Sequence, residues 1–276
     1  MFKKYLVLAS KKDKAGMNII THLLQFKKNP LVNAMADIGF DIGLVEEEII
    51  QTENLDMQKI IKYDFIIFAS KHQSEKSKKT LSVHAPGNWR SSQYGGEARK
   101  ACSSSALFSK FIFQKLNETA KKFSLSEYDI TMEATHHGPL INKPCLFIEI
   151  GSTESEWSDK RAAFVIAKTI SEAVSSFKED SYKEIAVAIG GPHYCPNFNK
   201  IQLSSNIAIS HVIANYSAPI TEEIIQEAIS KTFEEVDFAV LDWKGLGQAE
   251  QRDELIKVLD SNYIAWKKTS DIVKED

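Results

Sequence analysis

Short apolar runs of strand character alternate with amphipathic helical patterns along almost all of the 276 residues. This alternation is typical of an α/β fold, in which helices cover both faces of a central sheet. We therefore expect a three-layer αβα architecture with a largely parallel or mixed central sheet. The expected strands are 4–9, 41–45, 64–70, 81–84, 128–135, 145–150, 184–189, 206–209 and 238–241, and the expected helices are 16–26, 106–123, 159–177, 221–232 and 248–261.

Six of the seven histidines lie at the end of one of these expected strands or shortly after it; they are His72, His84, His136, His137, His193 and His211. Ligands of open parallel sheets bind outside the carboxyl ends of the strands, so histidines far apart in sequence can meet at one edge. A histidine at a strand end can also simply cap backbone groups. The repetition favours a shared site for most of the set.

Composition indicates an ordinary globular enzyme, with 43% hydrophobic and 26% charged residues. No apolar run approaches the ~18 residues of a membrane span, and the one at 4–9 is too short for a signal peptide. Three scattered cysteines exclude a disulfide framework. We expect a cytoplasmic protein with no membrane attachment and a single domain over 1–276. Within it, 71–105 forms a long irregular segment that is typical of a lid or binding loop.

Basic residues are concentrated in the first 100 positions, which hold 16 Lys and Arg against 11 Asp and Glu. Many of them lie in loops after strands, where they would surround the histidines and attract a phosphodiester chain. A solvated surface that serves only solubility is the alternative for each cluster. The candidate nucleic-acid contacts are Lys71, Lys76, Lys78, Lys79, Arg90, Arg99 and Lys100.

The stretch from Thr131 to Pro139 carries an acid and two adjacent histidines. Strand alternation places Glu133 and His137 on one face about 13 Å apart, too far to share a metal ion directly, and His136 on the other. Gly138-Pro139 ends the strand, so both histidines can reach one site as metal ligands, or as ligand plus general base. Rings bonded to neighbouring carbonyls are the structural alternative.

Two further segments that follow strands offer reactive groups. His193 and Cys195 can point the same way and form a zinc pair, although a buried turn with an idle cysteine explains them as well. His84 can ligate a metal, Asn88 can donate to an oxyanion, and Trp89 can stack on a nucleobase. The alternative there is a turn with Trp89 packed on the core.

The chain lacks the G-x-G-x-x-G, P-loop, G-x-S-x-G and H-E-x-x-H patterns. Five of its segments, in this order, instead resemble the archaeal and plant type of D-aminoacyl-tRNA deacylase. These segments are Asp13-Lys14-Ala15-Gly16-Met17-Asn18-Ile19, His84-Ala85-Pro86-Gly87-Asn88-Trp89, Thr135-His136-His137-Gly138-Pro139, Glu149-Ile150-Gly151-Ser152-Thr153-Glu154-Ser155-Glu156-Trp157 and Gly190-Gly191-Pro192-His193-Tyr194.

The resemblance implies a monomeric α/β protein with a fold like those of phosphorylases and peptidyl-tRNA hydrolases. It also implies a zinc-dependent hydrolase that cleaves the ester between a D-amino acid and tRNA, which serves chiral proofreading and D-amino acid detoxification. The leaving group of such an ester is a ribose hydroxyl, so a metal-activated water and an oxyanion donor suffice without a covalent intermediate.

On this hypothesis, Glu133 or a remaining histidine accepts the proton from water. The basic loops clamp the acceptor stem, and Trp89 or Tyr94 stacks on the terminal adenine. A pocket that clashes with the L side chain would select the D centre. The predicted zinc ligands are His84, His137, His193 and Cys195, and the predicted catalytic residues are Glu133, His136, His137 and Asn88.

Two other classes of function remain open from the sequence. A zinc peptidase or a nucleoside phosphorylase-like enzyme could use a site at the same strand ends. A non-catalytic tRNA-binding module with structural histidines would bind tRNA without turnover.

Overall fold

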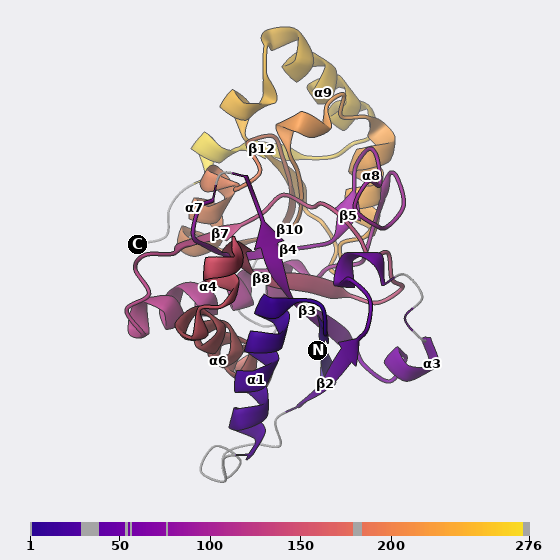
Figure 1. Ribbon diagram of the computed structural model, residues 1–276. Coiled ribbons are helices and arrows are strands. Elements are labelled where there is room, and N and C mark those ends of the chain that lie inside the picture. The colour runs from indigo at the N-terminus through magenta and orange to yellow at the C-terminus, as the bar shows by residue number, and fades with distance from the viewer. Residues whose placement is uncertain are drawn as a thin grey trace.

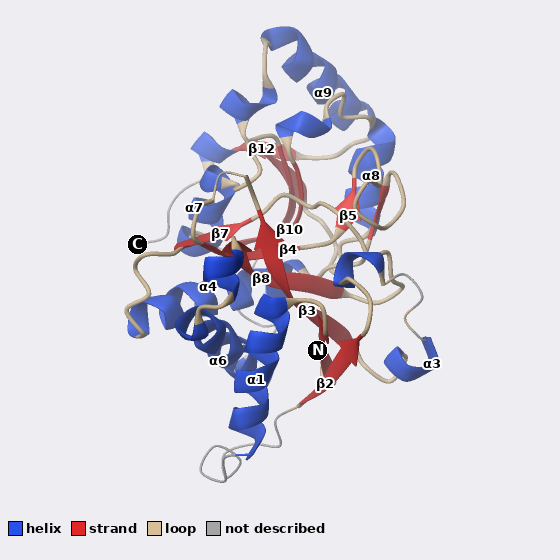
Figure 2. Ribbon diagram, in the orientation of Figure 1, coloured by secondary structure: helices blue, strands red, loops and turns tan. Residues whose placement is uncertain are grey.

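The computed structural model describes residues 2–28, 39–52, 55, 57–75, 77–178 and 184–272. The strands in these residues form three sheets: a six-stranded sheet, a four-stranded sheet and a small two-stranded one. The six-stranded sheet and helices α1, α4 and α6 lie in the lower half of Figure 1, and helices α8 and α9 lie with the four-stranded sheet in the upper half. The α/β class is confirmed, but the strands are divided between two main sheets (Figure 2).

The six-stranded sheet is mixed and has the order β2-β1-β3-β8-β4-β7. Four neighbouring strands run parallel, whereas β4 is antiparallel to β8, and β7 is parallel to β4. The carboxyl ends of β4 and β7 therefore point to the edge opposite to that of β3 and β8. The strands are β1 (Tyr5–Ser10), β2 (Phe40–Val45), β3 (Phe65–Gln73), β4 (Thr80–His84), β7 (Asp129–Met132) and β8 (Cys145–Ser152).

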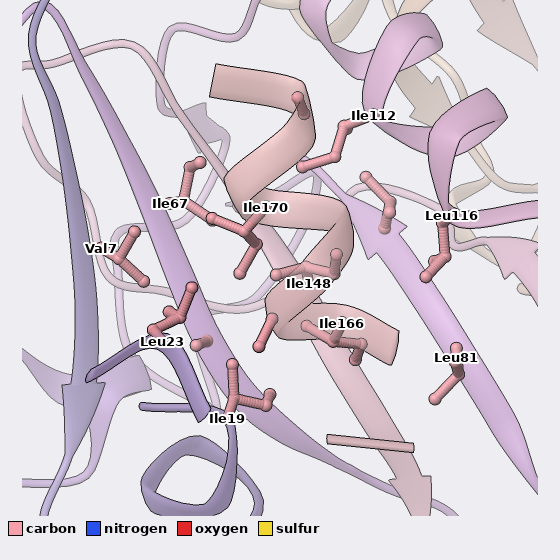
Figure 3. Packing of buried hydrophobic residues seen from close by; sticks show 14 of the residues in the cluster. Val7, Ile19, Leu23, Ile67, Leu81, Ile112, Leu116, Ile148, Ile166 and Ile170 are labelled. Atoms are coloured by element: carbon pink, nitrogen blue, oxygen red, sulfur yellow. The ribbon is translucent and has the colours of Figure 1, made fainter. Parts of the chain in front are cut away.

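Three helices cover one face of this sheet: α1 (Lys14–Lys28), α4 (Ala106–Lys122) and α6 (Lys160–Ser176). Figure 3 shows aliphatic side chains of the helices, among them Ile19 and Ile170, packed against those of the strands. Each such side chain contributes about 1.5–3 kcal/mol when it is fully buried. The other face carries a second apolar cluster, which includes Phe68 and Phe147, and polar side chains beside it.

The four-stranded sheet is parallel throughout, in the order β10-β9-β11-β12. The expected strand 206–209 is longer in the structure, and helix α7 forms where we expected only a loop. Pro196 begins α7 at a position where the missing N–H of proline costs nothing. The elements are β9 (Glu184–Ile189), α7 (Pro196–Ser204), β10 (Ile207–Ile213), α8 (Glu222–Ser230), β11 (Phe238–Leu241), α9 (Ala249–Ser261) and β12 (Trp266–Lys268).

The expected irregular segment 71–105 contains more structure than its composition suggests. Strand β3 continues to Gln73, β4 follows, and β5 (Gly87–Asn88) pairs with β6 (Lys100–Ala101). The remaining short elements are α3 (Met57–Ile60), α5 (Glu154–Trp157) and the 3₁₀ turns Ile49–Gln51, Asn215–Ser217, Trp243–Leu246 and Thr269–Asp271. Among the helices that the structure describes, none is long and apolar enough to cross a membrane.

Candidate active site

Polar side chains collect on the face of the six-stranded sheet that the helices leave uncovered. In β8, Ile148 and Ile150 belong to the core under the helices, so Glu149 between them points to the opposite face. The register pairs Glu149 with Ser70 of β3 and with Ser82 of β4. Two residues further along each of these strands, His72 and His84 therefore lie on the same face as Glu149.

His72 can lie flat against this face because its partner in the ladder is Gly151. A Cβ atom on Gly151 would lie only 2.7 Å from Cδ2 of His72, so a larger residue would displace the ring. Two backbone bonds bring in the other acid and a histidine of the second sheet. The Glu133 amide donates to Val83 O (3.1 Å), and the Ala134 amide donates to His193 O (2.8 Å).

Two buried carboxylates stand at the centre of this arrangement. Glu133 Oε1 lies 3.2 Å from Nδ1 of His72, and its Oε2 lies 3.2 Å from Nε2 of His193 and 3.6 Å from Nε2 of His136. We call the whole set the His–Glu cluster; its members are His72, His84, Glu133, His136, His137, Glu149 and His193.

Glu149 likewise lies among imidazoles of the cluster. Its carboxylate oxygens lie 3.6 Å from Nε2 of His84, 3.7 Å from Nδ1 of His72 and 4.0 Å from Nε2 of His137. Both oxygens of Glu133, one oxygen of Glu149 and Nε2 of His84 are buried without a hydrogen-bond partner in the described part of the chain. The contacts are thus close enough for charge attraction but are not directed as hydrogen bonds.

The histidines of the cluster differ in charge: some are charged beside the two carboxylates, and others are neutral. Burial lowers the pKa of His72, but Glu133 and Glu149 outweigh burial and raise that pKa to about 11. Burial likewise opposes the charge of Glu149, yet His72 and His84 hold its pKa at about 2. The pKa of Glu133 is held well below its ordinary value by His193 and His72, against the effect of burial. Both carboxylates are therefore ionised.

His136 and His137 remain neutral. Burial and the neighbouring imidazoles His137 and His84 lower the pKa of His136 well below its ordinary value. Burial and His84 lower the pKa of His137 to about 4. A neutral imidazole keeps one ring nitrogen with a free lone pair, which is the form that binds metals.

Each of the five histidines fixes one ring nitrogen outside the cluster and directs the other toward its carboxylates. His84, His136 and His137 use Nδ1 to donate to the carbonyls of Ala85, Ala134 and Gly138. His193 Nδ1 lies 3.0 Å from the hydroxyl of Tyr216, and His72 Nε2 lies 3.0 Å from the hydroxyl of Tyr194. Partners of this kind orient metal-binding imidazoles in proteins.

His137 adopts a left-handed backbone conformation, with φ of 46°. A residue other than glycine is rarely found there, and such backbone strain is frequent at functional sites. The Gly87 amide donates to His137 O (2.8 Å) and thereby holds the turn after β7 against the segment after β4. The strained turn brings both His136 and His137 into the cluster.

Three groups of side chains in the cluster have donor atoms within 4.8 Å of one another. Imidazole nitrogens and carboxylate oxygens suit Zn²⁺, and the unpartnered oxygens and Nε2 of His84 are free to serve as donors. The residues present therefore fit a zinc site. The groups are His72 with Glu133, His136 and His193; His84 with His136 and His137; and His84 with Glu133 and Glu149.

A cleft of about 720 Å³ opens over the cluster and is large enough for a sizeable ligand. His72, His136, His137, Glu149 and His193 line it at one end. Elsewhere its walls carry Lys71, Tyr94 and Trp157, and Lys71 Nζ lies 5.6 Å from the centre of the Trp157 ring. A smaller groove of about 200 Å³ also reaches His136, between Asn88 and Tyr216.

The structure brings five of the predicted site residues together: His84, Glu133, His136, His137 and His193. The expected alternation between His136 and His137 does not hold, because β7 ends at Met132 and the turn lets Glu133 approach His136. Convergence occurs on a face of the mixed sheet rather than at a common carboxyl edge.

Three predicted residues lie outside the cluster. Cys195 is buried in the core of the second sheet, where its thiol donates to His193 O and burial raises its pKa well above the ordinary value. The Asn88 amide donates to Gly95 O (2.8 Å). Trp89 is 3% exposed and donates to Val212 O, so its ring packs on the core, as in the structural alternative.

The predicted basic contacts are largely engaged with acidic side chains. Four of them face a glutamate: Lys71 with Glu48 (3.5 Å), Lys79 with Glu156 (4.0 Å), Arg99 with Glu223 (3.0 Å) and Lys100 with Glu227 (3.7 Å). Arg90 donates to Ala218 O and Lys78 is exposed. Lys76 lies outside the described residues.

Sequence reasoning counted His72 among the histidines that could meet but gave it no role, and it missed Glu149 as a member of the site and Tyr194 and Tyr216 as neighbours. Glu149 carried a usable signal, because it is the one charged residue in the apolar strand β8. The sixth histidine after a strand, His211, is not part of the cluster. It lies against Thr135 Oγ1 and donates from Nε2 to Lys231 O, as a structural histidine does.

Comparison with known proteins agrees with this geometry. The family model described as D-aminoacyl-tRNA deacylase matches residues 59–267. The chain is 31% identical to the D-aminoacyl-tRNA deacylase of Methanocaldococcus jannaschii, over 96% of this chain and 99% of that protein. It is 36% identical to the protein of that name from Pyrococcus furiosus, over 87% of this chain and 90% of that one.

A solved structure has the same fold. It is a crystal structure titled as a conserved protein of unknown function, with a TM-score of 0.85 and 30% sequence identity, and it covers 98% of this chain and 96% of its own. The resemblance seen in the sequence is thus confirmed: the chain belongs to the D-aminoacyl-tRNA deacylase family, a family of hydrolases.

Proposed function

We propose that this chain hydrolyses the ester bond between a D-amino acid and tRNA and releases both products, with zinc held in the His–Glu cluster. The family and the names of its relatives support the reaction. One observation carries the assignment of the site: five imidazoles, each fixed by an outside partner, point at two buried carboxylates, and three of the four carboxylate oxygens lack a hydrogen-bond partner among the described residues.

The candidate donors for zinc are His84, His136, His137, His193 and Glu149; His72 is left out because the neighbouring carboxylates raise its pKa to about 11, and Glu133 because we assign it another role. When bound, zinc would lower the pKa of a water molecule toward 7 and polarise the ester carbonyl. Cys195 is not included, because its thiol is buried among apolar side chains and donates to a backbone carbonyl.

Glu133 is the group that we assign to accept the proton of the attacking water. It is ionised, it is fully buried, and three histidines surround its two oxygens. His136 lines both the large cleft and the small groove, so we place the ester of the substrate beside it. One amide hydrogen of Asn88 is used by Gly95 O, and the other remains for the oxyanion at the groove.

The 720 Å³ cleft is our proposed entry for the acceptor end of tRNA. Lys71 and Tyr94 line it, whereas the buried Trp89 is not available to stack on a base. The ion-paired Lys79, Arg99 and Lys100 would add only weak phosphate contacts, since a paired cation must first give up its partner, and Arg90 already donates to Ala218 O; Lys78 is exposed. Selection of the D centre would come from a clash of the L side chain with the cleft wall.

All seven side chains of the cluster come from one chain, which supports action as a monomer. The proposed substrate is found in the cytoplasm, and we propose that the protein acts there. A zinc peptidase, a nucleoside phosphorylase-like enzyme and a non-catalytic tRNA-binding module are the alternatives that the test must separate.

The test is deacylation of D-Tyr-tRNA and L-Tyr-tRNA by the protein before and after treatment with a chelator, followed by addition of zinc. We expect rapid release of D-Tyr, much slower release of L-Tyr, loss of turnover with the chelator and recovery with zinc. Turnover of a small peptide or of inosine in place of D-Tyr-tRNA, or binding of tRNA without turnover, would contradict the proposal.

A further inference from the structure

A second cavity lies in the part of the molecule built by the four-stranded sheet. Its volume is about 350 Å³, and its walls come from α7, from the turn after β11 and from the turn after β12. We call it the α7 groove; its polar lining residues are Asn197, Lys200, Ser204, Asp242, Lys244 and Thr269.

The position of this groove is one that α/β folds use for ligands. Strand β9 lies between β10 and β11, so the chain leaves β9 toward one neighbour and later returns to its other side. At such a switch point the loops after the two central strands diverge and leave a crevice at their carboxyl ends. Asp242 follows β11 directly, and Asn197 lies in the first turn of the helix after β9.

The bottom of the crevice presents hydrogen-bonding groups held by the backbone. Asp242 is 4% exposed, and its Oδ2 accepts a hydrogen bond from Asn197 Nδ2 (3.0 Å). A Cβ atom on Gly191 would lie 2.8 Å from the same oxygen, so only glycine lets the strand end approach it. A buried carboxylate beside such a crevice has the acceptor oxygens that ribose hydroxyls need.

The groove also has positive charge and an aromatic wall. Lys200, Lys244 and Lys268 have no carboxylate of the described residues within ion-pair distance, unlike Lys71, Lys79 and Lys100 near the large cleft. Trp243 lines the groove, and Lys268 Nζ lies 4.1 Å from the centre of its ring. Because Lys268, Arg252 and Trp266 already lie against the Trp243 ring, the groove offers cations for phosphates rather than an open ring face for a base.

We propose that the α7 groove binds a ribonucleotide of the single-stranded acceptor end of tRNA, upstream of the terminal adenosine. Asp242 and Asn197 would hold the ribose hydroxyls, and Lys200 and Lys244 the phosphates. This inference rests on the proposed function, because it uses the same substrate.

The path from the active site to the groove is short. His193 lies in the connection between β9 and α7, and Asn197, four residues later, lies in the first turn of α7. The groove continues along α7 from Asn197 to Ser204, a length of about 10 Å. A strand whose terminal adenosine lies at the His–Glu cluster can therefore cross the start of α7 and enter the groove.

The double variant Lys200→Glu with Lys244→Glu tests the inference, and Lys257→Glu, at an exposed residue of α9 outside the groove, is the control for a charge reversal elsewhere on the surface. Deacylation is measured with D-Tyr-tRNA and with 3′-O-D-tyrosyl-adenosine, which lacks upstream nucleotides. We expect the advantage of tRNA over the short substrate in kcat/KM to fall at least tenfold in the double variant. In Lys257→Glu it should stay within twofold of the wild type.

Binding of uncharged tRNA supplies a second readout. For two lost contacts to a single strand, the slope of log K against log salt should decrease by about 1.4. An equal loss on both substrates, or a slope equal to that of Lys257→Glu, would overturn the inference. So would binding of free CMP as tight as that of the trinucleotide CpCpA. Absence of turnover on both substrates in the wild type would instead refute the proposed function.

Discussion

Lys110 and the His–Glu cluster both bury ionisable side chains, but only at Lys110 does the chain itself complete the pairing. Lys110 on α4 is fully buried, and its ammonium donates to the carbonyls of Gln202 (2.7 Å), Ser205 (2.7 Å) and Ile207 (3.0 Å). These carbonyls follow or end helix α7, where a cation is favoured and free acceptors need a donor. Lys110 therefore ties α4 to the second sheet.

In the His–Glu cluster, by contrast, both oxygens of Glu133 and Nε2 of His84 have no hydrogen-bond partner among the described residues. Buried polar atoms are almost always paired in folded proteins, so an unpaired group requires an explanation. Strongly shifted pKa values of groups that line a cleft are typical of functional sites. In this comparison the chain itself satisfies the buried charge of Lys110, whereas the cluster combines unpaired donor atoms with shifted pKa values at a cleft, as a ligand site does.

The variant Glu133→Gln tests this comparison with the largest expected effect. We expect kcat/KM on D-Tyr-tRNA to fall about 10³-fold, because the proton acceptor is lost. The free energy of unfolding of the metal-free protein should decrease as well, because His72 loses one of the two carboxylates that stabilise its buried charge. Steady-state kinetics and urea unfolding measure both. Glu118→Gln, on the exposed side of α4, is the control, and a loss of activity below tenfold would contradict the assignment.

The variant Lys110→Met is expected to lower the stability of the protein without lowering its activity. The free energy of unfolding should decrease by about 3 kcal/mol, because several buried carbonyls lose their donor. kcat of the folded variant should stay close to that of the wild type. Urea unfolding beside Lys115→Met, which changes a lysine on the same helix, measures the difference. Equal free energies of unfolding for the two variants would contradict the structural role that we assign to Lys110.

His211 tests the comparison with a histidine whose pairing is complete. Burial lowers its pKa to about 4, from an ordinary value of 6.5. The unfolded state then binds the proton first, so the stabilising contribution is complete above pH 6.5 and decreases as the pH falls toward 4. Between pH 6.5 and 5 the wild type should lose about 2 kcal/mol more stability than His211→Asn. Parallel pH profiles of unfolding would show that His211 does not titrate in this way.

The smallest effect is expected at Lys79, whose ammonium lies 4.0 Å from Glu156 at the surface. Lys79→Gln should change the free energy of unfolding by less than about 1 kcal/mol. Its effect on tRNA affinity should be smaller than that of the Lys200 and Lys244 double variant. If filter binding shows a larger loss of tRNA affinity for Lys79→Gln than for the double variant, the basic loops near the large cleft are the main contact to tRNA.

The sequence allowed prediction of the α/β class and of most histidines in the cluster, because both follow from local patterns. It did not allow prediction of Glu149 as a partner of His84, since that contact depends on β4 lying antiparallel to β8. Cys195 failed for a related reason: its neighbour His193 points to the cluster, whereas the thiol packs among Phe198 and other core residues. The sequence around Trp89 is compatible both with stacking on a nucleobase and with a position in the core. Only the tertiary packing shows that Trp89 lies in the core.

The most direct test of the account is the zinc content of the protein after dialysis against a trace of zinc, measured by elemental analysis. His136 belongs to two of the three donor groups, so the wild type should retain zinc and His136→Ala should lose it, together with deacylation of D-Tyr-tRNA. His211→Asn should retain both. Equal zinc content in the wild type and His136→Ala, or full activity of the wild type without zinc, would contradict the account.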